Sequence, residues 1–527
     1  MMSTIECSRP WATRLAGVIL GVLGLAASPS SGQVDHLARV NSTYVQVPES
    51  RRSDGILLRA LIAMDEPPIG IDSPEMAALT YAGSITWSLA EDWALAPAQR
   101  AALTALRQVT ENPDERHGMV FAQVYGSRVS PEFIRARAYT ELGDPPLLAG
   151  ARMHYLEQFE NLWILAHIEA MRLNTEGKTA EACDVLVRLI YVGRQLSDRV
   201  FAKEMRYGLS MMMDAATRIR DIAYEDFRGS RSLSPPQIQG IIAKLELYNR
   251  GYLNPERLVF PTGNKVAAEQ LLETLYVPRG GVREDLFASV MARLRTSDRP
   301  LRLFAEASRF ESAGANQADW FEVRDAINRV FDGWSSRWRL SAFDRQSALP
   351  HYWDQFDRSR FAVVTASTTD LSELFRMRRV FEAEVVGTRH ALAVLGYFYE
   401  LGVFPPDASS VRPRWLTQIE ADPFNPNRAA GRLPSLEYFV PVRDSYLPDE
   451  RAIAQPHRMN VFAPGGENFA MMLREDQFVM YSVGQDGVKN FAEDVSNDLD
   501  AITGDYLIWP PMLSIHREHL RDTGRLP

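Results

Sequence analysis

Apolar and polar positions alternate with a helical period over most of the chain. Between residues 154 and 250, three successive stripes of apolar residues recur at alternating spacings of four and three, which places each stripe on one face of a helix. Their members are Phe159, Trp163, Ala166, Ala170 and Leu173, then Ala182, Leu186, Leu189, Gly193 and Leu196, then Met205, Leu209, Met212, Ala216 and Ile219. Because Glu176, Gly177 and Lys178 interrupt the first two stripes, we predict an antiparallel helix pair.

Helix start signals and shorter apolar runs extend this pattern to both sides. Ser234 can cap a fourth helix, Pro235 fits its first turn, and the Gln237 side chain can reach back to the cap. Helical runs at residues 56–63 and 97–106 come earlier, and further patches lie between aromatic and arginine-rich loops after the fourth helix. We therefore predict helical packing through the first two thirds of the chain.

The last third of the chain has a different pattern. A helical period runs from about Leu371 to Glu400, and Gly402 is placed to end that helix. Strand-like sequence follows at residues 436–440 and again at residues 477–483. These features predict a long helix with two strands that lie side by side against it.

Together these patterns predict a mainly α protein, an irregular helical bundle followed by a small α+β domain with a long helix and an antiparallel sheet. We divide the chain into an export segment at residues 1–32, an N-terminal helical region at 33–150, a helical bundle at 151–365 and the α+β domain at 366–527. The length of 527 residues is enough for several domains.

The first residues have the form of an export signal. Arg9 and Arg14 precede an apolar run from Leu15 to Ala27, which as a helix extends roughly 20 Å and is too short for a hydrocarbon core of about 30 Å. Small residues up to Gly32 then supply a cleavage site, so we predict a cleaved signal peptide. The alternative is an uncleaved anchor, the only case in which we expect membrane association. Either form predicts an exported protein of the periplasm or cell envelope.

Charge and cysteine content narrow the possible partners. The formal net charge is -9, and only five of the 58 basic residues are lysines, so the arginine excess indicates genomic base composition rather than phosphate recognition. An acidic chain without a basic patch argues against nucleic acid and anionic membranes as partners. Cys7 would leave with the signal peptide, so Cys183 has no intrachain partner and is expected to be a buried thiol.

Four short motifs in the last third resemble one known family. They are Tyr397 with Gly402, Phe404 and Pro405, then Asp422-Pro423-Phe424, then Tyr438, then Tyr481-Ser482-Val483-Gly484-Gln485-Asp486-Gly487. In this order they resemble the major pseudopilin of type II secretion, the G subunit. The complete layout, with signal, helical region and pseudopilin-like tail, is similar to a group of uncharacterised exported bacterial proteins. The resemblance implies an architecture and does not imply a reaction.

The chain also departs from that family. A pseudopilin begins with a prepilin-peptidase site that leads directly into its long helix, whereas here the N-terminal apolar run has no such site. Some 340 residues separate that run from the long helix. We therefore do not expect this chain to be a pseudopilus component.

The resemblance implies a calcium-binding loop after the second predicted strand. Asp486 matches the loop aspartate of the family, Asp505 best fits its final carboxylate, and Asp498 and Asp500 come next. Calcium suits such a loop because it takes six to eight oxygen ligands in loose geometry. The alternative is a solvated acidic loop that binds no ion.

The function that we expect from these features is non-enzymatic. We predict an exported scaffold or interaction protein whose partner is a protein of the cell envelope. The alternative is an envelope hydrolase, in which Trp320, Trp334, Trp338 and Trp353 would line a carbohydrate-binding cleft by stacking. Core packing explains the same tryptophans. An enzyme should show a pocket in which two carboxylates, or a histidine and a carboxylate, meet with shifted pKa values.

Overall fold

A computed structural model gives the fold of the chain. It describes residues 35–114, 116–248, 251–295, 310, 313–340, 347, 349–427, 434–444, 456–463, 466–498 and 503–526. Helices make up 54% and strands 9% of the structure, so the prediction of a mainly α protein is confirmed. Residues His36–Pro527 form one compact unit. The predicted export segment at residues 1–32 lies outside the described residues.

Helices dominate the chain from residue 36 to residue 411. Those of the first half are α1 (His36–Val45), α2 (Asp54–Leu61), α3 (Pro74–Leu79), α4 (Trp87–Leu95), α5 (Pro97–Val109), α6 (Pro131–Arg135), α7 (Tyr155–Thr175), α8 (Thr179–Ser197), α9 (Ala202–Arg228) and α10 (Pro235–Lys244). Those that follow are α11 (Gly263–Leu275), α12 (Glu284–Arg295), α14 (Trp320–Trp338), α15 (Tyr352–Gln355), α16 (Ala362–Ser367) and α17 (Ser372–Leu401). Single 3₁₀ turns are η1 (Glu49–Arg51), η2 (Leu148–Gly150), η3 (Pro255–Arg257) and η5 (Ala408–Val411).

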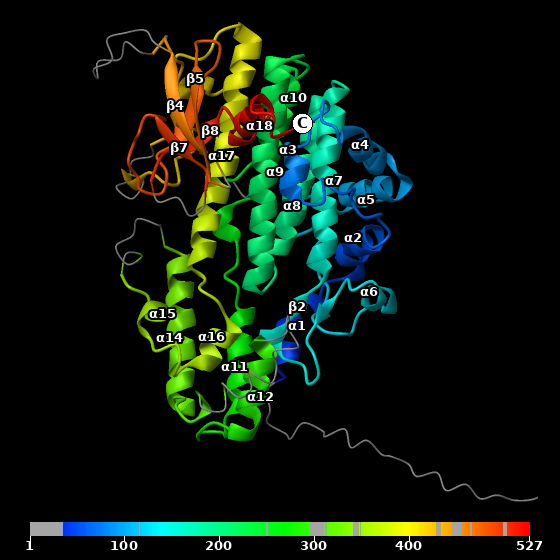
Figure 1. The fold of residues 1–527 in the computed structure, drawn as a ribbon, viewed down its shortest axis with the longest axis vertical. Coiled ribbons are helices and arrows are strands. Elements are labelled where there is room, and N and C mark those ends of the chain that lie inside the picture. Colours follow the sequence, from blue (N-terminus) through cyan, green and yellow to red (C-terminus); the bar gives the residue numbers. More distant parts are fainter. Residues whose placement is uncertain are drawn as a thin grey trace, which may run out of the picture. The chain divides into compact units, whose positions relative to one another are not determined.

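Helices α7, α8 and α9 carry the three apolar stripes and form the centre of the bundle. The first two helices are separated at Gly177, as predicted, where a φ of 72° is easily adopted by glycine. The predicted cap of α10 is also present, because the Ser234 amide donates to Gln237 Oε1 at 2.9 Å. Helices α11, α12, α14 and α16 pack on one another as a further helical group, and α1 joins α11 (Figure 1).

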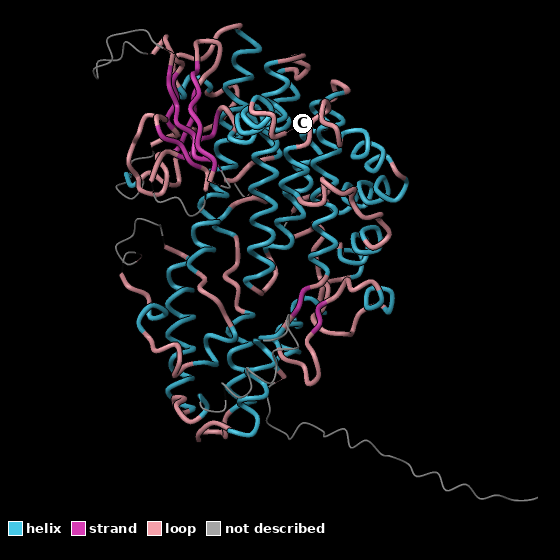
Figure 2. Tube along the Cα trace, viewed as in Figure 1, coloured by secondary structure: helices cyan, strands magenta, loops and turns pink. Residues whose placement is uncertain are grey.

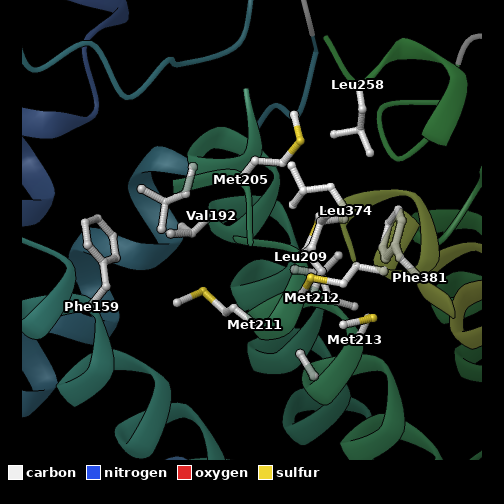
Figure 3. Packing of buried hydrophobic residues seen from close by; sticks show 14 of the residues in the cluster. Phe159, Val192, Met205, Leu209, Met211, Met212, Met213, Leu258, Leu374 and Phe381 are labelled. Carbon is white, nitrogen blue, oxygen red and sulfur yellow. The ribbon is translucent and has the colours of Figure 1, made fainter. Parts of the chain in front are cut away.

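The long helix α17 connects the bundle to the C-terminal strands. On one side it packs on α9 and α10, where Leu374 and Phe381 lie beside Leu209 and Met212 of α9 (Figure 3). On the other side it contacts β6 (Val479–Ser482) and β8 (Tyr506–Trp509). Its end at Gly402 is confirmed, because this residue takes a φ of 74° after the last turn.

The C-terminal strands form two small sheets (Figure 2). In the first sheet β3 (Glu437–Phe439) pairs antiparallel with β6, and β6 pairs antiparallel with β8. The two strands predicted from the sequence therefore lie side by side. The second sheet has the order β5-β4-β7, made of β4 (His457–Ala463), β5 (Glu467–Leu473) and β7 (Asp494–Ser496). The chain ends in α18 (Met512–Asp522), and a two-stranded sheet of β1 (Thr140–Glu141) and β2 (Arg152–Met153) lies before the bundle.

The contact between α17 and β8 depends on a small residue. A Cβ atom at Gly387 would lie 2.5 Å from Cδ1 of Ile508, a distance at which one of the two side chains has to move. Ile508 belongs to the main hydrophobic core, and Gly387 is buried in α17. The glycine thus sets how closely the first sheet approaches the long helix.

Candidate functional site

The C-terminal motifs meet around the side chain of Asp422. Its Oδ1 atom accepts hydrogen bonds from Ser482 Oγ at 2.7 Å and from the Phe424 amide at 2.9 Å, and its Oδ2 atom accepts from the Val483 amide at 3.2 Å. The second and fourth motifs are therefore tied together across sixty residues of chain. Tyr438 extends this arrangement, since its hydroxyl donates to the carbonyl of Pro405 at 2.9 Å.

Asp422 reaches this position without a cationic partner. Its side chain is completely buried and makes no ion pair with any residue that the structure describes. Burial raises the pKa of the Asp422 carboxyl to about 6, although the hydrogen bonds from Phe424, Ser482 and Val483 act to lower it. The carboxylate is a structural acceptor whose charge is only partly compensated.

Asp505 organises the acidic loop between β6 and β8. Both carboxylate oxygens accept a hydrogen bond from the Asn490 amide at 3.2 Å, and Oδ2 also accepts from the Ala492 amide at 2.6 Å. The side chain is fully buried. Burial raises the pKa of Asp505 to about 6; the two amides lower it, while the charges of Asp486 and Glu437 raise it further. This is a second buried carboxylate that has amide donors but no guanidinium.

Of the four predicted calcium ligands, three lie among the described residues, and they differ in exposure. Asp486 is exposed, accepts the Val488 amide at 2.9 Å and lies close enough to Asp505 to affect its pKa. Asp498 is exposed just after β7, and Asp500 lies outside the described residues. Among the residues that the structure covers, no three acidic, histidine or cysteine side chains come together as a metal site. Of the predicted ligands, Asp486 and Asp505 are the two whose charges interact.

The aromatic middle region is part of the core. Trp334, Trp338 and Trp353 are 2%, 5% and 4% exposed, and the Trp338 indole donates to the carbonyl of Leu258 at 2.8 Å. His351 stacks on Trp334 with the ring centroids 4.8 Å apart, and burial lowers its pKa to about 4. Trp320 is half-buried. A sugar-binding cleft needs exposed ring faces, which these three buried indoles do not provide.

A cavity with apolar and charged walls lies at a place that the sequence did not indicate. It has a volume of about 400 Å³ and is formed by the C-terminal ends of α7 and α9, by α18 and by the loop at Tyr81. Its floor is an ion network in which Arg517 donates to both oxygens of Asp221, at 3.0 and 2.7 Å, and to Glu225 Oε1 at 2.5 Å. Ser514 also donates to Asp221, at 2.6 Å.

The charges around this cavity are unevenly compensated. Burial raises the pKa of Glu225, and the neighbouring Asp221 raises it further, whereas Arg517 lowers it. Burial also raises the pKa of Glu518, whose nearest cation is Arg228 with Nη1 3.4 Å from Oε1. The sequence signal for this site is weak, because its residues come from four distant segments, and only the charged pattern of α18 marks one wall.

The single cysteine of the bundle is not a reactive group. Cys183 is fully buried on α8, as predicted, and burial raises the pKa of its thiol to about 12. A thiol in that state is not a nucleophile near neutral pH.

Comparisons with protein-family models, with curated proteins and with solved structures gave no match for this chain. No helix among the residues that the structure describes has both the length and the apolar character needed to cross a membrane.

Proposed function

We propose that the protein is a non-enzymatic, exported scaffold or interaction protein of the cell envelope, with a pseudopilin-like α+β unit at its C-terminus. One observation carries this proposal. The four motifs that resemble the type II secretion G subunit meet in space: Ser482 and Val483 donate to Asp422, β3 pairs with β6, and β6 packs on α17. A chance similarity of four short segments would not require these contacts.

The packing of α17 favours a role other than filament assembly. Its buried residues run from Leu374 to Gly396, and the bundle helices α9 and α10 of the same chain cover it. No open apolar stripe is left on this helix for a neighbouring copy. The proposal is therefore a folded interaction module rather than a pseudopilus subunit.

Calcium is the ion that we propose for the acidic loop. Asp486 and Asp505 would hold it, and Asp498 and Asp500 are the further predicted ligands. The support is electrostatic, since Asp505 is buried beside the negative charges of Asp486 and Glu437 and has only amide donors. A bound cation would lower the repulsion among these carboxylates and stabilise the loop.

Cell fractionation tests the export part of the proposal. The complete tagged chain, expressed in its native host, should appear in the periplasmic or envelope fraction, and a variant that lacks residues 2–32 should stay in the cytoplasm. Mass spectrometry of the purified protein should place its N-terminus after Gly32 if the signal is cleaved. Recovery of the complete chain in the cytoplasm would contradict the proposal.

The size of the protein in an envelope extract tests the interaction part. After mild crosslinking in cells, the protein should elute well above the 59.4 kDa of one chain, and the purified protein alone should elute as a smaller species. Elution of the cellular protein as a free chain would count against a scaffold role.

A further inference from the structure

The cavity between α7, α9 and α18 has the features of a small-molecule site. Its volume of about 400 Å³ falls within the usual range for ligand pockets of roughly 300–1,000 Å³. Rings of Tyr81 and Tyr224 and the side chain of Met171 give it an apolar side, and arginine and glutamate side chains give it a polar side. Pockets of this kind bind compact ligands with a few charged groups rather than polymers.

One cation at the cavity is exposed, and it interacts with the carboxylates of Glu225 and Glu518 only beyond ion-pair distance. Arg521 lies with its guanidinium carbon 4.6 Å from the ring centroid of Tyr81, and it makes no ion pair within the described part of the chain. A planar guanidinium held against a ring keeps its N–H donors directed outward in a fixed fork, which suits a carboxylate.

One carboxylate at the cavity is 42% exposed, and the charges of Arg228, Arg521 and Arg517 act on it. Glu518 lies three residues before Arg521 on α18, and its one ion-pair contact among the described residues is the 3.4 Å approach of Arg228. Side chains three residues apart on a helix are neighbours on one face, about 5–6 Å apart at Cβ. The helix therefore presents an acceptor for a cation beside a donor for an anion.

The floor of the cavity is engaged in ion pairs and hydrogen bonds of its own. Arg517 is committed to Asp221, Glu225 and the carbonyl of Ala78, and its side chain is only 4% exposed. The Nε atom of Arg517 is buried without a partner among the described atoms. Arg517 is therefore engaged within the network below the cavity, and Glu518 and Arg521 are adjacent opposite charges on α18 that a ligand can meet.

We propose that this cavity binds a free α-amino acid with an apolar side chain, with the ligand carboxylate on Arg521 and its ammonium group on Glu518. The two opposite charges of an amino acid are adjacent, as are these two side chains. Tyr81, Tyr224 and Met171 would contact the apolar side chain of the ligand. This inference is independent of the scaffold function, because no residue of the acidic loop takes part in it.

Calorimetric titration of the purified complete chain with L-phenylalanine tests the proposal. Binding should be measurable, and phenylalaninamide, which lacks the carboxylate, and N-acetylphenylalanine, which lacks the ammonium group, should each bind roughly tenfold or more weakly. The dipeptide Phe-Phe, in which the charged groups are further apart, should also bind more weakly. Equal binding of all four probes, or no binding of L-phenylalanine or L-leucine at millimolar concentration, would overturn the proposal.

Two variants assign the contacts. Arg521→Gln should weaken binding of L-phenylalanine by roughly tenfold and abolish the preference over phenylalaninamide, and Glu518→Gln should abolish the preference over N-acetylphenylalanine. Arg525→Gln is the matched control, because Arg525 lies beyond α18 and donates to Glu467 instead. If Arg525→Gln weakened binding as much as Arg521→Gln, the assignment would be wrong. The comparison of probes on the unaltered protein remains decisive if a variant does not fold.

Discussion

The helical bundle and the C-terminal sheets differ in how some of their buried carboxylates are compensated. Both bury carboxylates, but several carboxylates on the helices are paired with arginine: Glu204 with Arg199 at 2.8 Å, and Glu384 of α17 with Arg220 of α9 at 2.5 Å. In the C-terminal unit, the donors to Asp422 and Asp505 among the described residues are amides and one hydroxyl, and burial raises the pKa of each to about 6.

This difference has a physical consequence for each region. A buried carboxylate with an arginine is compensated, and it becomes costly only when one partner is removed. A buried carboxylate with neutral donors keeps much of its desolvation cost, so its region responds to protons and to cations. The bundle should therefore be sensitive to mutation of its charges, and the C-terminal unit should be sensitive to solution conditions.

The largest effect is expected from Glu204→Gln in the bundle. The substitution leaves the Arg199 guanidinium buried without its carboxylate and also weakens the acceptor for the Tyr125 and Tyr155 hydroxyls. Loss of one partner of a buried ion pair should lower the free energy of unfolding by about 3–5 kcal/mol, measured by urea denaturation.

Asp325→Asn is the control for this prediction. It breaks the ion pair of Asp325 with Arg329, in which both side chains are more than half exposed. The free energy of unfolding should change by less than about 0.5 kcal/mol. Similar losses of unfolding free energy in the two variants would show that the buried pair of Glu204 and Arg199 stabilises the fold no more than an exposed ion pair does.

The buried arginines were not predicted from the sequence. From the sequence alone, the arginine excess indicates genomic base composition. In the structure, Arg199, Arg218 and Arg220 are among the largest fully buried side chains. Helical stripes follow from local spacing and were predicted correctly, because the period of an α-helix is a property of consecutive residues. A buried ion pair depends on which helices meet, and no local pattern contains that information.

The same reasoning explains what was predicted in the C-terminal unit. Gly402 and the strands β3 and β6 follow from local signals, and their order in the chain led to the predicted pairing. The strands β4, β5, β7 and β8 were not predicted, and neither was the hydrogen bond that Ser482 donates to Asp422. The cavity at Arg521 was not predicted because its walls come together only when the C-terminal helix α18 packs on the bundle.

The pH dependence of Asp422→Asn tests the C-terminal side of the comparison. The folded pKa of Asp422, about 6, lies above its ordinary value of 3.8, so the native state retains a proton that the unfolded state releases. The stability that this group contributes is present at acidic pH and is lost as pH rises from about 4 to about 6. Between pH 4.5 and pH 7 it should decrease by about 2 kcal/mol in the unaltered protein.

Asp422→Asn should remove this decrease in the free energy of unfolding between pH 4.5 and pH 7. His351 contributes with the opposite sign, since its lowered pKa of about 4 makes stability rise with pH in the same window. This contribution is present in both proteins and cancels in the difference between them. Urea denaturation at pH 4.5 and pH 7 gives the two slopes, and identical slopes would refute a poorly compensated Asp422.

Gly387→Ala tests the contact that joins the two regions. The new Cβ atom would lie 2.5 Å from Ile508 Cδ1, so we expect a loss of about 1–3 kcal/mol from overpacking. Gly240→Ala on α10 is the matched control, because nothing lies within 4 Å of its Cβ position and alanine favours a helix. The midpoint temperature of thermal unfolding should fall for Gly387→Ala and stay equal or rise for Gly240→Ala. Equal midpoints would mean that β8 does not pack closely on α17.

Calcium should have the smallest effect and should act only in the C-terminal unit. An ion that binds the native loop alone stabilises the protein by RT ln(1 + [Ca]/Kd), about 0.4 kcal/mol at a concentration equal to Kd and about 1.4 kcal/mol at ten times Kd. The thermal midpoint should therefore rise with added calcium, and Asp486→Asn should remove the rise. A cation beside Asp505 also lowers the pKa of that carboxyl, so saturating calcium should flatten the pH slope that remains in Asp422→Asn. A midpoint that does not move with calcium would leave Asp505 as an acceptor for the Asn490 and Ala492 amides, with no ion in the loop.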